Sequence, residues 1–315
     1  MKADRIHGVL LVDKPAGMTS HDAVQKIRRQ VGQRRVGHTG TLDPQATGLL
    51  VVCLGQATKL SRFLSEMDKT YRARVCLGRT SSTYDAEGVD LSEPAAAVPP
   101  LTSDKLAEVL NRYTGIITQQ VPAYSAVRVG GQRLYRQARK GTDVEPPERE
   151  VQIKRIDLED FSDPMLTITV ACSSGTYIRT LAHDIGRHLG CGGYLAGLRR
   201  VSVGHLLVSE AVPVDDIADV VRSGRLAERL LSPDRVLEYG CLTVSDGFAE
   251  EVLSGKDLRA VDVVDTEGSF EAGQKVFLRG TDGAILAIGV AETASRDIGR
   301  TESGDKLFKY LRVLK

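Results

Sequence analysis

The residues that most directly offer chemistry lie in one polar turn, which runs from His38 to Pro44 as His-Thr-Gly-Thr-Leu-Asp-Pro. The proline restricts the backbone of Asp43 to extended conformations and so helps to fix the direction of its carboxylate. The apolar run Leu49–Leu54 that follows predicts a buried strand, and therefore a rigid support. A carboxylate fixed in this way can act as a nucleophile or stabilise a cation, although an Asp-Pro pair can also simply organise a turn.

Four further segments combine charged or aromatic side chains with turn residues. In chain order they are Gly8–Pro15, which ends in Lys14 and Pro15; Asp68–Arg72, which contains Tyr71; Gly175–Thr180, which contains Tyr177 and Arg179; and Leu198–Arg200.

Together, these five segments resemble the motifs of the TruB-type pseudouridine synthases, in the same order, and the resemblance extends from about Gly8 to the C-terminus. Five ordered motifs are more specific than one, so we favour a catalytic role for Asp43. The resemblance implies a bacterial-type isomerase that converts uridine to pseudouridine at position 55 in the T loop of tRNA. It implies flipping of the base and an aspartate-dependent exchange of the glycosidic bond, with no cofactor and no metal.

The resemblance also implies a catalytic set of Asp43, Tyr71, Tyr177 and Arg179. The Tyr71 ring would replace stacking lost by the flipped base, at about 1–3 kcal/mol per base; from its residue type alone, a packed strand tyrosine is the other interpretation. The guanidinium of Arg179 matches a carboxylate and would keep Asp43 ionised and oriented. Tyr177 would move a proton at C5, for which a hydroxyl with an ordinary pKa of about 10 needs help.

The sequence leaves the chemical step at Asp43 open. An ionised aspartate can attack C1′, attack C6 of the ring, or stabilise a separated sugar–base state that loses a C2′ proton. His38, Lys14 and Leu198 are expected to contact the substrate. For His38 we expect a contact with the RNA backbone or assistance in flipping, and a packed core or turn histidine is the alternative.

A basic segment at 122–149 is predicted to be an insert that grips RNA. Prolines and glycines interrupt it, tyrosines lie among its cations, and no acidic residue separates those cations. Arginine suits this role because it can stack on bases as well as contact phosphate. The family analogue is a thumb-like loop that closes on the T loop. The cations are Arg128, Arg133, Arg136, Arg139 and Lys140.

We expect an α+β fold. The resemblance implies a catalytic domain over residues 1–240, with a mixed, largely antiparallel sheet and flanking helices, followed by a small PUA-like β-barrel at 241–315. Short apolar runs and glycine turns in the tail agree with a small barrel. A hinge is expected near 210–240, so deletion of the tail should leave a folded domain. Periodicity predicts strands at 8–13, 49–54, 70–78, 151–157 and 166–172, and helices at about 20–31, 101–113 and 176–189.

Composition limits the class of protein. Residues 1–79 contain 14 Lys and Arg against 6 Asp and Glu, whereas residues 241–315 contain 10 against 13. A basic region suits a polyanion, although it is also typical of a plain solvated surface. No apolar run approaches the roughly 20 residues that span a bilayer, and the N-terminus has no apolar signal core, so we expect a cytoplasmic protein. The five scattered cysteines favour reduced, packed thiols over a metal site.

The expected partner is tRNA, bound through its T-arm, with no membrane contact and no obligatory protein partner, and the chain is expected to be a monomer. One alternative is a non-catalytic RNA-binding or tRNA-folding protein on the same scaffold, but such a protein does not need Asp43. A glycoside hydrolase usually needs two carboxylates that flank the bond, and no second acid stands out near Asp43. A guide-RNA-dependent synthase is disfavoured by the short N-terminus and the lack of a lysine-rich tail.

Overall fold

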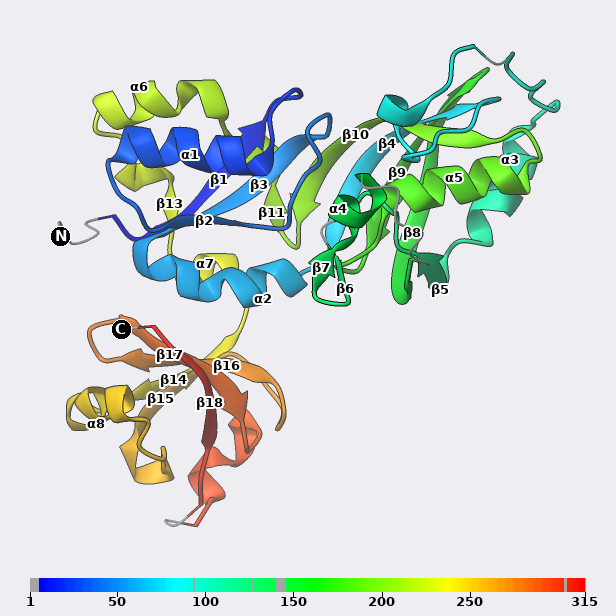
Figure 1. Ribbon diagram of the computed structural model, residues 1–315. Helices are drawn as coiled ribbons and strands as arrows, with labels where there is room; N and C mark the ends of the chain where they lie inside the picture. Colours follow the sequence, from blue (N-terminus) through cyan, green and yellow to red (C-terminus); the bar gives the residue numbers. More distant parts are fainter. Residues whose placement is uncertain (1–5, 93, 126, 140–145, 303–304, 315) are drawn as a thin grey trace.

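The computed structural model describes residues 6–92, 94–125, 127–139, 146–302 and 305–314. Within these ranges the chain forms a large sheet with helices on both faces and a smaller β-domain that lies below it in Figure 1. No described helix is both long and apolar enough to cross a membrane. All five cysteines are free thiols.

The large sheet has eleven strands, which are β1 (Gly8–Lys14), β2 (Val36–Thr39), β3 (Thr47–Leu54), β4 (Lys69–Leu77), β5 (Gly115–Gln120), β8 (Glu148–Ser162), β9 (Met165–Cys172), β10 (Gly193–Val203), β11 (Leu206–Leu207), β12 (Val212–Pro213) and β13 (Leu230–Leu231). Eight of them follow the order β12-β1-β3-β10-β4-β9-β8-β5, and β13, β2 and β11 pair with β1, β3 and β10. The pairs β1–β12 and β3–β10 are parallel and the other described pairs in this sheet are antiparallel. The predicted mixed, largely antiparallel sheet is therefore confirmed.

Helices cover the sheet in two groups, which Figure 1 shows at its left and right. They are α1 (Ser20–Val31), α2 (Ser61–Glu66), α3 (Ser103–Asn111), α5 (Ile178–His188), α6 (Ile217–Arg222) and α7 (Pro233–Val236). One apolar cluster joins α1 and α6 to β1 and β3, and a second joins α3 and α5 to β4, β8 and β9. The three predicted helices are confirmed as α1, α3 and α5. Thr19 begins α1 through a capping box with Asp22, which satisfies free amides of the first turn.

Strands β1 and β3 are buried on both faces. Leu10 and Val12 pack with α1, whereas Val9 and Leu11 pack with the opposite cluster around α2. A strand covered on both faces has no polar alternation, which explains the continuous apolar runs in the sequence. The Asp43 turn leads directly into β3, so the predicted rigid support for this turn is present.

The expected hinge near 210–240 is wrong. Strands β12 and β13 pair with β1, and Ile217 and Val220 of α6 are buried against the first sheet cluster. The short elements of this region looked like a linker in the sequence because each is too short to show a period. In the structure they complete the large domain.

The insert at 122–149 contains a small hairpin and a helix, β6 (Arg128–Val129), β7 (Gln132–Arg133) and α4 (Leu134–Arg139). The hairpin turns at Gly130 and Gly131, which have φ of 58° and 80°, a backbone that glycine adopts without strain. Main-chain bonds from Leu134 and Tyr135 fold the helix back onto the start of the insert. Lys140 lies outside the described residues.

The C-terminal domain is a five-stranded sheet in the order β15-β14-β16-β17-β18. Three strands correspond to the predicted short runs, whereas β14 and β18 were not predicted. Its elements are β14 (Gly240–Val244), α8 (Asp246–Glu251), β15 (Val263–Glu267), β16 (Lys275–Gly280), β17 (Ile285–Ala291) and β18 (Phe308–Val313).

This domain shares an apolar cluster with the large one. Phe277 and Ile288 pack in the same cluster as Phe63 of α2, and Lys275 forms an ion pair with Glu66 at 2.7 Å. Removal of the tail would expose this cluster to water, so the folded domain that is predicted to remain after the deletion would carry a new apolar surface.

Candidate active site

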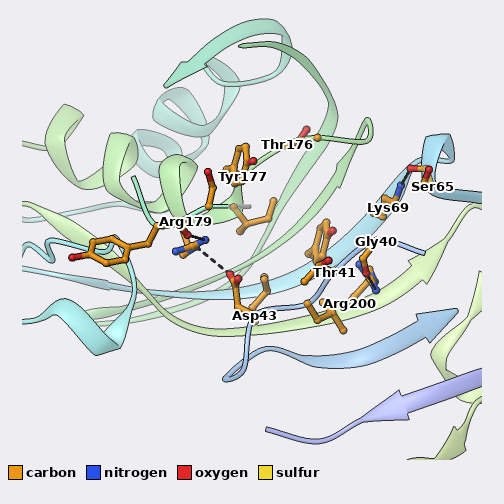
Figure 2. A pocket seen from close by; sticks show the side chains of 16 residues that line it. Gly40, Thr41, Asp43, Ser65, Lys69, Thr176, Tyr177, Arg179 and Arg200 are labelled. Atoms are coloured by element: carbon orange, nitrogen blue, oxygen red, sulfur yellow. Dashed lines mark hydrogen bonds and ion pairs between the residues drawn. The ribbon is translucent and has the colours of Figure 1, made fainter. Parts of the chain in front are cut away.

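A concave pocket of about 290 Å³ lies where the Asp43 turn, β4, the start of α5 and β10 meet. Figure 2 shows side chains from these separate parts of the chain pointing toward one another. Five of the predicted site residues line the pocket, namely Asp43, Tyr71, Tyr177, Arg179 and Leu198. The fold therefore brings together segments that are far apart in the sequence.

The Asp43 turn is hydrogen-bonded to the loop before α1 and to the first residue of this helix. The Gly17 amide donates to the Pro44 carbonyl at 3.0 Å. The buried Ser20 hydroxyl donates to the Leu42 carbonyl at 3.0 Å and accepts from the Leu42 amide at 2.9 Å. These bonds fix the backbone on both sides of the aspartate, so its carboxylate is presented from a constrained turn.

Lys14 supports the same turn from inside the protein. Its side chain is fully buried, and Nζ donates to the carbonyls of Pro15 and Met18 at 2.7 Å and of Pro44 at 3.2 Å. Burial lowers the pKa of Lys14, an effect that the charge of Asp43 opposes. A fully buried side chain has no surface to offer to RNA, so the prediction that Lys14 contacts RNA is wrong.

Arg179 connects the turn to two other segments. Its Nε lies 3.1 Å from Asp43 Oδ2 (dashed in Figure 2), and its Nη1 lies 3.4 Å from Asp85 Oδ2. Its Nη2 donates to the Tyr124 carbonyl of the insert at 3.0 Å. The predicted contact between Arg179 and Asp43 is present. The statement that no second acid stands near Asp43 is corrected, because Asp85 shares the same guanidinium.

The surroundings of Asp43 reduce the hydration of its carboxyl group and change its pKa. Burial raises the pKa of Asp43 above its ordinary value; Arg179 and Lys14 oppose this rise, and Asp85 adds to it. Although its side chain is 46% exposed, the carboxyl lies within a concave pocket where surrounding protein limits hydration. The cation of Arg179 therefore favours the ionised form of this carboxyl.

Beside the aspartate, Tyr71 and Arg200 form a second part of the pocket. Arg200 is 1% exposed and donates to the carbonyls of Leu49 at 2.7 Å and Gly40 at 2.9 Å. Burial raises the pKa of the Tyr71 hydroxyl, and Arg200 opposes this rise. A Cβ added to Gly48 would lie 2.2 Å from the Arg200 carbonyl oxygen, so the glycine permits the close approach of β3 and β10.

Tyr177 lies at the N-terminal end of α5, where Figure 2 shows it above Asp43. The buried Gln119 side chain holds its backbone, accepting from the Tyr177 amide at 3.0 Å and donating to its carbonyl at 3.3 Å. The Ser125 hydroxyl, which belongs to the insert, is buried at the same pocket and has no partner in the described part of the chain. The pocket therefore offers aromatic surface, one carboxylate and several hydroxyl groups.

Comparison with known proteins identifies the family. Residues 28–178 match the TruB family pseudouridylate synthase N-terminal domain, residues 179–238 the tRNA pseudouridylate synthase B C-terminal domain, and residues 240–314 the PUA domain. The tRNA pseudouridine synthase B of Dechloromonas aromatica is 48% identical over 74% of this chain and 77% of that protein. The tRNA pseudouridine synthase B of Syntrophus aciditrophicus is 40% identical over 97% of this chain and 98% of that protein. This chain belongs to the TruB family of pseudouridine synthases.

Solved structures support the fold of this TruB-family chain. A chain of a Cbf5-Nop10-Gar1 complex has a TM-score of 0.76 at 23% identity and covers 98% of this chain and 85% of that one. A chain of an H/ACA RNP bound to a substrate RNA containing 2′-deoxyuridine has a TM-score of 0.75 at 22% identity, over 98% and 85% of the two chains. At these identities the likeness concerns the fold alone.

Among the predicted RNA-contacting residues whose side chains the structure describes, Leu198 lines the pocket and the others do not. His38 is on β2, partly buried, and does not line the pocket. Burial lowers the pKa of His38, and its Nδ1 has no partner among the described residues. Arg128 and Arg136 are exposed on the insert. Arg133 and Arg139 lie in β7 and α4, but their side chains are outside what the structure describes.

Asp85, which contacts Arg179, and the pocket-lining Arg200 and Lys69 were not predicted as site residues. Asp85 had no signal near the motifs and meets Arg179 only through the fold. Arg200 belongs to the Leu198–Arg200 segment, and its place two residues after Leu198 was the available signal. Lys69 lines the pocket next to Tyr71 in the motif, and burial lowers its pKa to about 8, with Arg200 adding to the shift.

Proposed function

We propose that this chain isomerises uridine to pseudouridine at position 55 in the T loop of tRNA. The observation that carries the proposal is the Asp43–Arg179 ion pair at 3.1 Å inside a pocket that Tyr71 and Tyr177 also line. The relatives at 40–48% identity are tRNA pseudouridine synthases B, and the four implied catalytic residues are all present at this pocket.

The reaction breaks the N1–C1′ bond, turns the base, and joins C5 to C1′. The base must first leave its stack, and the ring of Tyr71, which lines the pocket, would receive the flipped base. Asp43 acts as a carboxylate, whether it attacks C1′, attacks C6 or stabilises a separated sugar–base state, because each route needs its negative charge. Arg179 favours that charge, and the Tyr177 hydroxyl lies at the same pocket to move the proton at C5.

The rest of the chain serves tRNA binding in this proposal. The exposed arginines of the insert would contact phosphates of the T-arm, and Leu198 and His38 would contact the nucleotides around the pocket. We propose a catalytic domain at 1–240 and a PUA-like RNA-binding domain at 241–315. The enzyme would act in the cytoplasm as a monomer, with no cofactor, metal or protein partner.

The test uses the purified full chain with an unmodified tRNA transcript and no added RNA or protein. We expect pseudouridine at position 55, mapped by chemical modification and primer extension, and none in a transcript with cytidine at that position. Binding without product would favour the non-catalytic RNA-binding alternative. Product that requires an added guide RNA would favour the guide-dependent class and overturn the proposal.

A further inference from the structure

One residue beside the pocket has a backbone conformation that its side chain disfavours. Tyr84 has φ of 63° and is the one non-glycine residue with positive φ in the described part of the chain. Residues with a Cβ adopt this region rarely, and such conformations persist where neighbouring contacts hold them. Tyr84 stands between Thr83 and Asp85, both of which contact Arg179.

An aromatic stack holds the ring of Tyr84, whose amide also donates to the Ser81 carbonyl at 3.2 Å. Its ring lies on the imidazole of His183 with the ring centroids 4.1 Å apart and the planes at 17°. His183 is on α5, one turn after Arg179, so the two side chains occupy the same face of the helix. Burial lowers the pKa of His183, and its Nδ1 has no hydrogen-bond partner among the described residues. The contact that the structure shows for this imidazole ring is therefore the stack with Tyr84.

The backbone around Tyr84 carries groups that reach Arg179. The Thr83 carbonyl accepts from Arg179 Nη1 at 3.4 Å, and Asp85 Oδ2 lies 3.4 Å from the same nitrogen. The Thr83 hydroxyl donates to the other Asp85 oxygen, and the Tyr84 carbonyl accepts from the Leu195 amide at 2.9 Å. Both contacts with Arg179 are at the long limit of a hydrogen bond, so a small shift of the 83–85 loop would break them.

We propose that Tyr84 and His183 are positioning residues for the pocket. Their stack fixes the 83–85 loop against α5, the loop fixes the Arg179 guanidinium, and Arg179 orients the Asp43 carboxylate. Neither ring lines the pocket, so the pair acts through Arg179 and does not touch the substrate. The inference rests on the proposed isomerase function and adds two residues to it.

The test compares variants that separate the ring from the backbone. Tyr84→Gly removes the ring but adopts positive φ freely, whereas Tyr84→Phe keeps the ring. We expect Tyr84→Gly to lower the single-turnover rate about tenfold or more, on the scale of a small misplacement of reacting groups, with tRNA affinity unchanged. Tyr84→Phe should stay within about twofold of the wild type. His183→Ala should match Tyr84→Gly, and His183→Phe should recover most of the rate.

A double variant distinguishes positioning from general stability. In an Asp85→Asn background, Tyr84→Gly should cause little further loss, because the contact that it positions is already weakened. An independent readout is exchange of the Arg179 Nε proton with solvent, measured by NMR and assigned by its absence in Arg179→Lys. Exchange should accelerate in Tyr84→Gly but not in Tyr84→Phe.

The inference is overturned if Tyr84→Gly keeps both the wild-type rate and slow proton exchange, if Tyr84→Phe is as impaired as Tyr84→Gly, or if the losses with Asp85→Asn multiply independently. A wild-type chain that forms no pseudouridine would instead contradict the proposed function. In that case the proton-exchange comparison still decides whether the stack positions Arg179.

Discussion

The Asp43 turn and the insert at 122–149 both carry residues expected to act on RNA, but the fold supports them in opposite ways. Near Asp43, Lys14 and Arg200 are at most 1% exposed and donate to backbone carbonyls. The insert instead presents Arg128 and Arg136 to solvent. A reacting carboxylate must keep one geometry, whereas exposed cations can adjust to phosphates along an RNA. Buried cations thus build the site, and exposed ones are suited to find the substrate.

Arg179 is the point at which these two regions meet. One nitrogen pairs with Asp43, and another donates to the Tyr124 carbonyl at the start of the insert. The side chain is 8% exposed, so both contacts form where water competes weakly. A shift of the insert that displaced Tyr124 would therefore move the Arg179 guanidinium and change its contact with Asp43.

Removing the charge of Asp43 should have the largest effect. Asp43→Asn keeps the shape of the side chain but removes the carboxylate, so the single-turnover rate should fall by about 10³-fold or more, as for a group that acts in the transition state. The affinity for tRNA, measured by filter binding, should change little because the exposed arginines remain. A near-wild-type rate for Asp43→Asn would contradict the assignment of the aspartate.

Removing the buried cation beneath the turn should have the next largest effect. Lys14→Met keeps the length of the side chain but leaves three carbonyls without their donor, at a cost of about 2 kcal/mol in the free energy of unfolding. The rate should fall about tenfold because the turn loses a support, with no change in the salt dependence of binding. The exposed Lys105→Met on α3 is the matched control. A selective loss of tRNA affinity in Lys14→Met would restore the interpretation of Lys14 as an RNA contact.

Lys14 and its control Lys105 also show which features of the site the sequence could not predict. Runs such as Leu49–Leu54 predicted buried strands because burial on both faces leaves a continuous apolar pattern. A lysine at the end of such a run carries no signal that three distant carbonyls surround its ammonium group. Asp85 was missed for the same reason, since its contact with Arg179 joins residues 94 positions apart.

The C-terminal domain shows a second limit. Alternating short runs predicted strands β15, β16 and β17, but a period of two cannot identify what each face packs against. Phe277 and Ile288 pack in the apolar cluster of the large domain, a contact that the strand pattern did not indicate. The family motifs predicted residues that line the pocket, whereas their interaction partners became visible only in the fold.

Neutralising the exposed cations of the insert should affect binding and leave the chemistry intact. Arg128→Ala combined with Arg136→Ala should lower tRNA affinity about tenfold and reduce the slope of log affinity against log salt by about 1.5–2, as for two lost phosphate contacts. The rate at saturating enzyme should stay within about twofold. Arg222→Ala with Arg225→Ala, on and beside the distant helix α6, is the control. An unchanged salt slope would mean that these arginines are merely solvated.

The smallest effect should be a shift of the pH–rate profile in Asp85→Asn. Burial and the charge of Asp85 both raise the pKa of Asp43, and the reaction needs the carboxylate. The wild-type rate should therefore fall on the acid side at a higher pH than an ordinary aspartate would give. Asp85→Asn removes one cause of the raised pKa of Asp43 and leaves Arg179 free to pair with Asp43. Both changes lower this pKa and move the acid limb to lower pH. The maximal rate should fall, because Arg179 loses a partner that positions it. The acid limb is measured from single-turnover rates at saturating enzyme, with each pH profile normalised to its own plateau. The control variant Asp219→Asn on α6 should leave the acid limb in place. An acid limb that stayed fixed or moved to higher pH in Asp85→Asn would show that the limb reports a group other than Asp43.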